Sequence, residues 1–191
     1  MQNYLEWEGD RMVSNGGIVS EAKASSQPEL ASEVRAEQLQ FIEFQLDSHI
    51  FAALETEIVQ EVLSIKAQNV VPVPNMPSTV LGLMSRRGRV YWTIDLAMML
   101  GLPHLSAEVK QYEVMILNVE NLLLAVAVPK IKGMIKVSVN LVSTSTQSCP
   151  TTLKSYSKGS MTLHQEDQMR SPRVIYVLKA EAIARSGILH S

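Results

Sequence analysis

The stretch that decides the fold is PNMPSTVLGLMSRRGRVYWTIDLAMMLGLP, residues 74–103. Its opening Pro-Asn-x-Pro turn excludes strand pairing at that point, because proline lacks the backbone donor that a strand ladder uses. Asn75 can cap a short helical turn that ends at Gly82. The chain then enters Arg86-Arg87-Gly88-Arg89, a polar hairpin tip whose glycine adopts dihedrals that other residues rarely reach. The pattern predicts a joint between strands that carries one charged projection.

The second half of this stretch predicts a strand followed by a short helix. Residues 90–94 have the β-branched and aromatic composition of a strand. Asp95 then fits an N-cap for an apolar helix over 96–100, with Gly101 as its left-handed stop and Pro103 as the breaker beyond. No obvious catalytic group occurs in the unit. We therefore expect the function to be located in a surface and not in a reaction.

Composition bounds the class of protein. The chain has 191 residues, enough for one generous domain or two small ones that share a core. Hydrophobic residues make up 46% and charged residues 19%, as in ordinary globular proteins, and the net charge of −2 provides no field that would attract nucleic acid or an anionic membrane. The single cysteine, Cys149, excludes an internal disulfide and a cysteine metal cluster. A reducing cytoplasm is the expected compartment.

No targeting segment is visible. Residues 1–10 are acidic and lack the apolar region of a signal peptide. The longest apolar stretch, residues 114–128, is interrupted by Asn118, Glu120 and Asn121. It is too short to span a bilayer and predicts two buried strands around a turn. We therefore expect no direct membrane contact.

The pattern along the chain predicts a tail and a mainly β body. Residues 1–36 are rich in Glu, Ser, Ala, Asn and Gly with little periodicity, which indicates a flexible tail. The body shows about nine or ten short strands with brief helices at junctions, no close internal repeat and no βαβ rhythm, so small packed β-barrels are expected. Expected elements include strands at 39–46, 50–54, 70–74, 90–94, 114–119, 122–128, 131–139, 156–163 and 173–178, a helix or irregular strand at 58–65, a long loop at 140–155 and a helix at 180–185.

Other reactive residues form no recognisable site. The four histidines share no ligand spacing with one another or with Cys149, and no nucleophile elbow, phosphate loop or dinucleotide fingerprint occurs. Asp95 precedes an apolar turn, where a carboxylate caps free amides. We expect no catalytic residue, no metal and no cofactor. The histidines are His49, His104, His164 and His190.

Residues 74–103 resemble the central signature of the CheW-like domain, the chemotaxis coupling module. That signature combines a Pro-Asn-x-Pro turn, an apolar turn with a glycine, an Arg-Gly hairpin and an Ile-Asp-Leu helix start. The matching residues are Pro74, Asn75, Pro77, Gly82, Arg87, Gly88, Ile94, Asp95, Leu96 and Gly101-Leu102-Pro103. Elsewhere the likeness is one of pattern, and it covers roughly residues 39–186.

The resemblance implies a mainly β fold of two small five-stranded SH3-like barrels that share a hydrophobic seam, with short junction helices and a short C-terminal helix. It implies a domain over 37–186, in which the first barrel spans about 39–103 and is completed by about 173–186. The second barrel then spans about 110–163.

The resemblance also implies a function. The protein is expected to be a non-enzymatic cytoplasmic adaptor that couples methyl-accepting chemoreceptor-type proteins to a CheA-like histidine kinase in a taxis or motility pathway. The divergent signature and the long tail favour a pilus-type twitching or phototaxis system over flagellar chemotaxis.

Partner-binding residues follow from the same resemblance. In the family the arginine of the Arg-Gly hairpin lies at a partner surface and can pair with a glutamate from the segment after the second strand; these correspond to Arg87 and Glu61. Apolar residues nearby receive the helical tip of a receptor. Val59, Val62 and Leu63 could also simply be core: a core position is favoured for Val62, whereas for Val59 a core position and an exposed contact are equally expected. The expected partner-binding residues are Val59, Glu61, Val62, Arg86, Arg87 and Gly88.

Three departures from the family pattern bear on the partner contacts more than on the fold. Trp92 replaces the usual proline, Ser85-Arg86 replaces Asn-Leu, and Pro129 replaces the aspartate after the second-barrel strand. Trp92 is most simply a core or seam residue, although tryptophan is also enriched at interfaces.

Two other functions compete with the adaptor. A small β-barrel could bind nucleic acid through the Arg86–Arg89 hairpin, but no aromatic residues or wider basic stripe accompany the arginines. A hydrolase with a dispersed site ranks last, because no nucleophile–base motif is present. The arginines could also form only a solvated turn that keeps a β edge from pairing.

Overall fold

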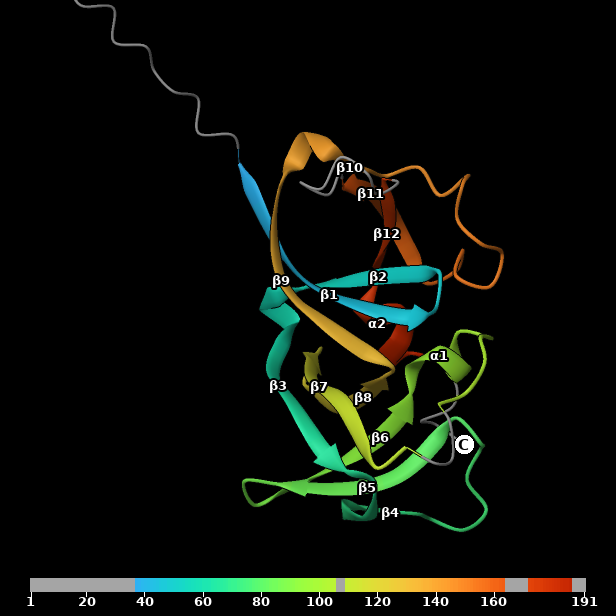
Figure 1. Cartoon of the computed structure of the whole chain (residues 1–191). Helices are drawn as coiled ribbons and strands as arrows, with labels where there is room; N and C mark the ends of the chain where they lie inside the picture. Colours follow the sequence, from blue (N-terminus) through green and yellow to red (C-terminus); the bar gives the residue numbers. More distant parts are fainter. Residues whose placement is uncertain (1–36, 106–108, 164–171, 187–191) are drawn as a thin grey trace, which may run out of the picture. The chain divides into compact units, whose positions relative to one another are not determined.

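The computed structural model describes residues 37–105, 109–163 and 172–186, which belong to one compact unit. The predicted tail over 1–36 lies outside the described residues. The described chain is mainly β and forms two six-stranded sheets, both strongly curled (Figure 1). No helix in these ranges is long and apolar enough to cross a membrane.

The first sheet has the strand order β10-β11-β12-β2-β1-β9, and the second has the order β3-β7-β8-β6-β5-β4. The strands of the first sheet are β1 (Gln38–Asp47), β2 (Ile50–Glu55), β9 (Lys130–Ser138), β10 (Val142–Ser143), β11 (Ser157–Leu163) and β12 (Arg173–Leu178). Those of the second are β3 (Val59–Lys66), β4 (Val70–Val71), β5 (Val80–Arg86), β6 (Arg89–Asp95), β7 (Gln111–Val119) and β8 (Leu122–Val128). Short helical elements join them: α1 (Leu96–Met99), α2 (Ala180–Ala184), and the 3-10 turns η1 (Thr56–Ile58), η2 (Ala67–Asn69) and η3 (Val139–Leu141).

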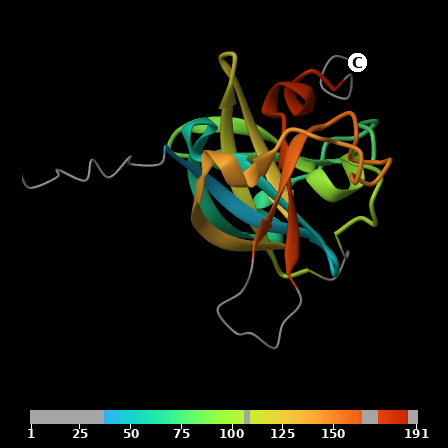
Figure 2. The same cartoon turned by 90° about the horizontal axis from the view of Figure 1, so that it is seen from above.

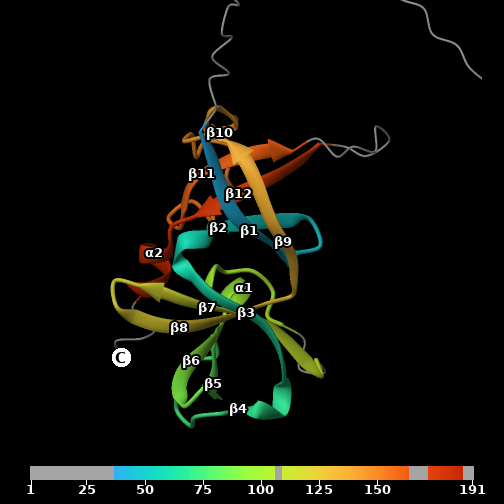
Figure 3. The same cartoon turned by 90° about the vertical axis from the view of Figure 1, so that its left-hand side faces the viewer.

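The chain is an internal structural repeat whose halves exchange hairpins. The first half runs from β1 to β6 and α1, and the second from β7 to β12 and α2. In each half the first hairpin lies in one sheet and the remaining four strands lie in the other. The parallel pair of β2 with β12 has its counterpart in the parallel pair of β8 with β6. Seen from the left-hand side of Figure 1, the corresponding end strands β9 and β3 both face the viewer (Figure 3).

Two glycines occupy corresponding bulges in the two halves. Gly82 interrupts the register of β5 with β6, and Gly159 interrupts that of β11 with β12. A Cβ on Gly82 would lie 2.1 Å from the carbonyl oxygen of Val71, and one on Gly159 would lie 2.2 Å from that of Ser143. Close approach to a two-residue strand therefore requires glycine in both sheets. The expected helical turn ending at Gly82 was wrong, because Gly82 lies inside β5.

A shared core confirms the predicted hydrophobic seam. Buried side chains from the first sheet, such as Phe44 and Leu54, belong to the same cluster as Met115 and Val126 of the second. Residues of α1 and α2 fill the same seam, including Leu96 and Ile183. Each sheet also encloses a smaller core of its own, and β9 curves strongly around the first (Figure 2).

The predicted barrel boundaries were wrong in how they divide the strands. Strands β3 to β6 were expected in the first barrel and lie in the second sheet, whereas β9 to β11 were expected in the second barrel and lie in the first sheet. The cause is the exchange of hairpins: after β2 the chain passes through η1 into the other sheet, and after β8 it crosses back. The ambiguous segment 58–65 is almost entirely β3, and the expected loop 140–155 contains β10.

Local signals in residues 74–103 were more accurate. The buried Asp95 carboxylate accepts hydrogen bonds from the backbone amides of Met98 (3.0 Å) and Leu105 (2.6 Å), so the predicted N-cap is confirmed. Gly101 follows the helix with φ 76°, as a left-handed stop requires. The predicted strand over 70–74 shortens to Val70–Val71, because Pro72 cannot donate to the ladder.

Candidate partner-binding surface

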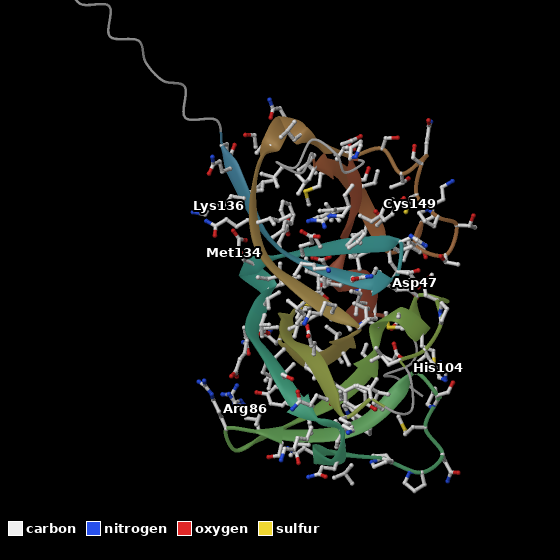
Figure 4. The ribbon with its side chains drawn as sticks, in the orientation of Figure 1. Asp47, Arg86, His104, Met134, Lys136 and Cys149 are labelled. Carbon is white, nitrogen blue, oxygen red and sulfur yellow. The ribbon has the colours of Figure 1, made fainter. Side chains whose placement is uncertain are left out.

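The β5–β6 hairpin ends in a two-residue turn that places one arginine at its tip. Arg86 and Arg89 face each other as the last strand pair, and Arg87 and Gly88 between them have φ values of 50° and 75°. Two positive φ values define the type I′ turn, which matches the twist of paired strands. Nothing lies within 4 Å of a Cβ built on Gly88, so only its dihedral favours glycine there. Figure 4 shows Arg86 near the outer end of this hairpin.

Glu61 of β3 receives the arginines through one carboxylate oxygen. Nη2 and Nε of Arg86 lie 2.5 and 3.2 Å from Oε1, and Nη2 of Arg87 lies 3.4 Å from the same atom. The hydrogen bond from Arg86 lowers the pKa of Glu61, and the same contact raises the pKa of Arg86. The Arg87 side chain is 75% exposed, against 42% for Arg86. Arg86 is therefore the principal partner of Glu61.

A hollow of about 360 Å³ opens beside this ion pair. It is lined by Gln60, Glu61, Arg87, Arg89, Tyr91 and Ile116. Tyr91 and Ile116 belong to the core of the second sheet and form an apolar floor. Arginines from the turn and from β6 stand at its edge, so the hollow combines an apolar base with a cationic rim.

The structure overturns the expectation for one of the two candidate valines of β3. Val62, for which a core position was favoured, is 44% exposed. Val59 is half-buried and packs against the seam core. The reason is the strand alternation of β3, in which Glu61 and Leu63 turn inward while Val62 turns outward. Val90 of β6 is exposed as well, at 65%, and was not among the expected site residues.

The structure brings Glu61, Arg86, Arg87 and Gly88 together, as the resemblance implied, but changes which arginine makes the closer contact. Arg87 was expected to pair with Glu61 because it matches the family signature. Arg86 takes that place because it ends β5 with an inward-facing side chain, whereas Arg87 sits in the turn. Gln60, Tyr91 and Ile116 were not expected at this site. Arg89, the strand partner of Arg86, was expected in the hairpin but not among the partner-binding residues.

The first sheet carries a second ion pair that the sequence did not reveal. The Glu43 carboxylate of β1 lies 2.8 Å from Nη2 of Arg173 in β12. The Arg173 guanidinium and the Lys132 ammonium lie 4.7 and 5.9 Å from the centroid of the Phe51 ring. Glu43 is only 2% exposed, although its alternation with apolar residues predicts an exposed face. Burial raises the pKa of Glu43, and the charges of Arg173 and Lys132 oppose that rise.

The described residues hold no group of three or more His, Cys, Asp or Glu side chains that could bind a metal ion. The candidate surface itself offers ionic, hydrogen-bonding and apolar contacts, which are the elements of protein recognition.

Comparison with known proteins identifies the fold family. A model of the CheW-like domain matches residues 40–187, which is most of the chain. Among solved structures, the chain is similar to the scaffolding protein TtCheW from Thermoanaerobacter tengcongensis, with 17% identity and a TM-score of 0.62 over 75% of this chain and 90% of that one. A search of curated proteins finds no significant match. Because the family model matches most of the chain and the fold agrees with it, the chain belongs to the CheW-like domain family.

Proposed function

We propose that the protein is a non-enzymatic cytoplasmic adaptor that couples methyl-accepting chemoreceptor-type proteins to a CheA-like histidine kinase. The observation that carries this proposal is the arginine hairpin with its Glu61 contact, presented on a CheW-like fold. In that family the hairpin lies at a partner surface, and here its side chains are accessible.

The proposed mechanism is geometric. The two sheets share one buried core, so a partner held on one sheet is fixed relative to a partner held on the other. The hairpin surface of the second sheet, with exposed Val62, would hold the kinase, although the resemblance assigns the apolar residues of this neighbourhood to the receptor tip. A separate surface would then hold the receptor. Coupling in this way makes and breaks no covalent bond.

The pathway that we propose is a pilus-type twitching or phototaxis system. The support is the divergent hairpin, in which Ser85-Arg86 replaces the usual Asn-Leu. Deleting the gene should abolish directed surface motility while leaving swimming chemotaxis unchanged, as measured by colony expansion on a surface and in soft agar. The reverse result would assign the protein to flagellar chemotaxis.

The decisive test of the adaptor is a pull-down from the native cytoplasm with the full chain. Wild type should recover a CheA-like histidine kinase, and Arg87→Glu should recover less, because the substitution reverses a charge at the tip of the hairpin. Lys154→Glu makes the same charge change at an exposed residue of a distant loop and should recover as much kinase as wild type.

Recovery of nucleic acid without a kinase would contradict the adaptor and support the alternative of a nucleic-acid-binding barrel. In that case oligonucleotide affinity should fall steeply with salt, since arginine–phosphate contacts release counterions. The net charge of −2 and the lack of a wider basic stripe beside the hairpin in the sequence argue against this alternative.

A further inference from the structure

The hairpin carries more positive charge than its carboxylate can neutralise. Three arginines project around Glu61, and Arg86 occupies the accepting oxygen at 2.5 Å. Arg87 reaches the same oxygen only at 3.4 Å from a side chain that is 75% exposed, so solvent weakens this contact. Arg89 makes no ion pair with any residue in the described part of the chain. Two of the three guanidinium groups are thus available to a partner.

The backbone of the turn argues that the position of Arg87 matters. Its φ of 50° lies in the left-handed region, where asparagine, aspartate and glycine are the common residues of such turns. An arginine there is locally unfavourable, and strained residues of this kind cluster at ligand clamps and functional sites. The hairpin presents a guanidinium at its tip despite that local cost.

The hollow beside Arg87 and Arg89 suits a carboxylate. Tyr91 and Ile116 at its base belong to the buried core, and the guanidinium groups of Arg87 and Arg89 line it above them. The planar fork of a guanidinium matches the two oxygens of a carboxylate. Val90 is exposed and directly follows Arg89 in β6, and Val62 is exposed and directly follows Glu61 in β3, so an apolar side chain of the same partner can pack beside either residue.

We propose that this hollow receives an aspartate or glutamate side chain of the docking protein, held between Arg87 and Arg89. Arg86 is then a positioning residue: it holds Glu61 and so keeps that carboxylate from competing for Arg87. The proposal rests on the proposed function in one respect, namely that the docking protein is the kinase. The kinase must then present an aspartate or glutamate side chain at its docking surface.

The test is the affinity of the full chain for the kinase's regulatory domain, measured by calorimetry at several salt concentrations. Arg87→Gln and Arg89→Gln should each weaken binding at least tenfold, and the affinity of each should depend less on salt than that of wild type. Arg87→Lys should fall between, because lysine keeps the charge but loses the fork. Circular dichroism and thermal melts should match wild type, which separates lost contact from lost fold.

A charge-swap experiment identifies the partner carboxylate. Each aspartate and glutamate on the kinase domain is replaced in turn by lysine, and one such variant should restore binding to Arg87→Glu. The role of Arg86 has its own signature: Arg86→Gln should weaken binding, and Arg86→Gln combined with Glu61→Gln should recover it, because the competing carboxylate is gone. A purely structural role for Arg86 would give no such recovery.

The outcomes separate the two proposals. If wild type binds the kinase domain but Arg87→Gln and Arg89→Gln bind equally well with the same salt dependence, the carboxylate site is overturned and the adaptor function stands. If wild type does not bind the kinase domain at all, the adaptor function is overturned and the carboxylate site with it.

Discussion

In each sheet a glutamate faces an arginine, but the two pairs occupy different strands. In the second sheet Glu61 lies on the end strand β3 and reaches the hairpin, whereas in the first sheet Glu43 lies on the inner strand β1 and reaches β12. Matching register shifts make Glu43 the structural counterpart of Ile116, and Gly133 that of Glu61. The arginine changes strand as well, because Arg173 pairs with Leu163 in β11 as Arg89 pairs with Arg86 in β5, so that Arg173 is the counterpart of Arg89.

The displacement changes what the pair can do. Glu43 is buried in the first sheet, and desolvation raises its pKa even though Arg173 is near. Glu61 remains partly exposed, and hydrogen bonding lowers its pKa. The same residue types therefore give a buried pair that bears on stability and an accessible pair that suits recognition. Burial decides which of these applies.

The largest expected effect tests the repeat on which this comparison depends. Gly82→Val and Gly159→Val should each destabilise the fold by about 3–5 kcal/mol, since each Cβ would overlap a carbonyl of a two-residue strand. Urea unfolding measures the loss. Gly88→Val is a control for side-chain size at an open position and should cost only the strain of its positive φ. Gly82→Val should cost somewhat more than Gly159→Val, because only Gly82 has a positive φ. A larger difference between the two losses of unfolding free energy would contradict the equivalence of the two halves.

The next effect separates the two ion pairs. Arg173→Ala leaves the Glu43 carboxylate buried without its main partner and should destabilise by about 2–4 kcal/mol, less than for a fully enclosed pair because Arg173 is partly exposed. Arg86→Ala should change stability much less, because Glu61 can be solvated. Both are measured by urea unfolding at neutral pH. Replacing both Glu43 and Arg173 by leucine should recover most of the loss, and failure to recover would show that the pair itself stabilises the fold.

The pH dependence of stability should have opposite signs at the two sites. The folded-state pKa of Glu43 is raised, so its contribution is full below the unfolded value near 4.5 and is lost as pH rises through the folded pKa. The folded-state pKa of Glu61 is lowered, so its contribution is present above that value and is lost as pH falls. Unfolding free energies between pH 3 and 7 (roughly the range that both titrations cover) should be compared for wild type, Glu43→Gln and Glu61→Gln. A Glu43→Gln curve parallel to wild type above pH ~4.5 would contradict the first assignment.

The contrast between the sites also explains what the sequence could predict. The cap at Asp95, the stop at Gly101 and the arginine hairpin depend on neighbours within a few residues, and all were predictable. The barrel boundaries depend on which sheet each hairpin joins, a non-local choice that periodicity does not encode. Alternation placed Glu43 on an exposed face because it cannot distinguish a solvated face from the inside of a curled sheet. The preference of Glu61 for Arg86 depends on which arginine ends the strand and which enters the turn.

The smallest expected change in stability concerns Val62, which faces outward from β3, in contrast to Val59, which packs against the seam core. Val62→Ala should leave the unfolding free energy within about 0.5 kcal/mol, because Val62 is already exposed, yet it should lower the affinity for the kinase domain if the hairpin surface is the docking site. Val59→Ala should cost about 1–2 kcal/mol, because Val59 packs against the seam shared by both sheets. Measuring both quantities on both variants separates docking from packing. If Val62→Ala lowers the stability but leaves the affinity unchanged, the docking site does not include β3. The accessible pair of Glu61 and Arg86 would then not be the recognition site.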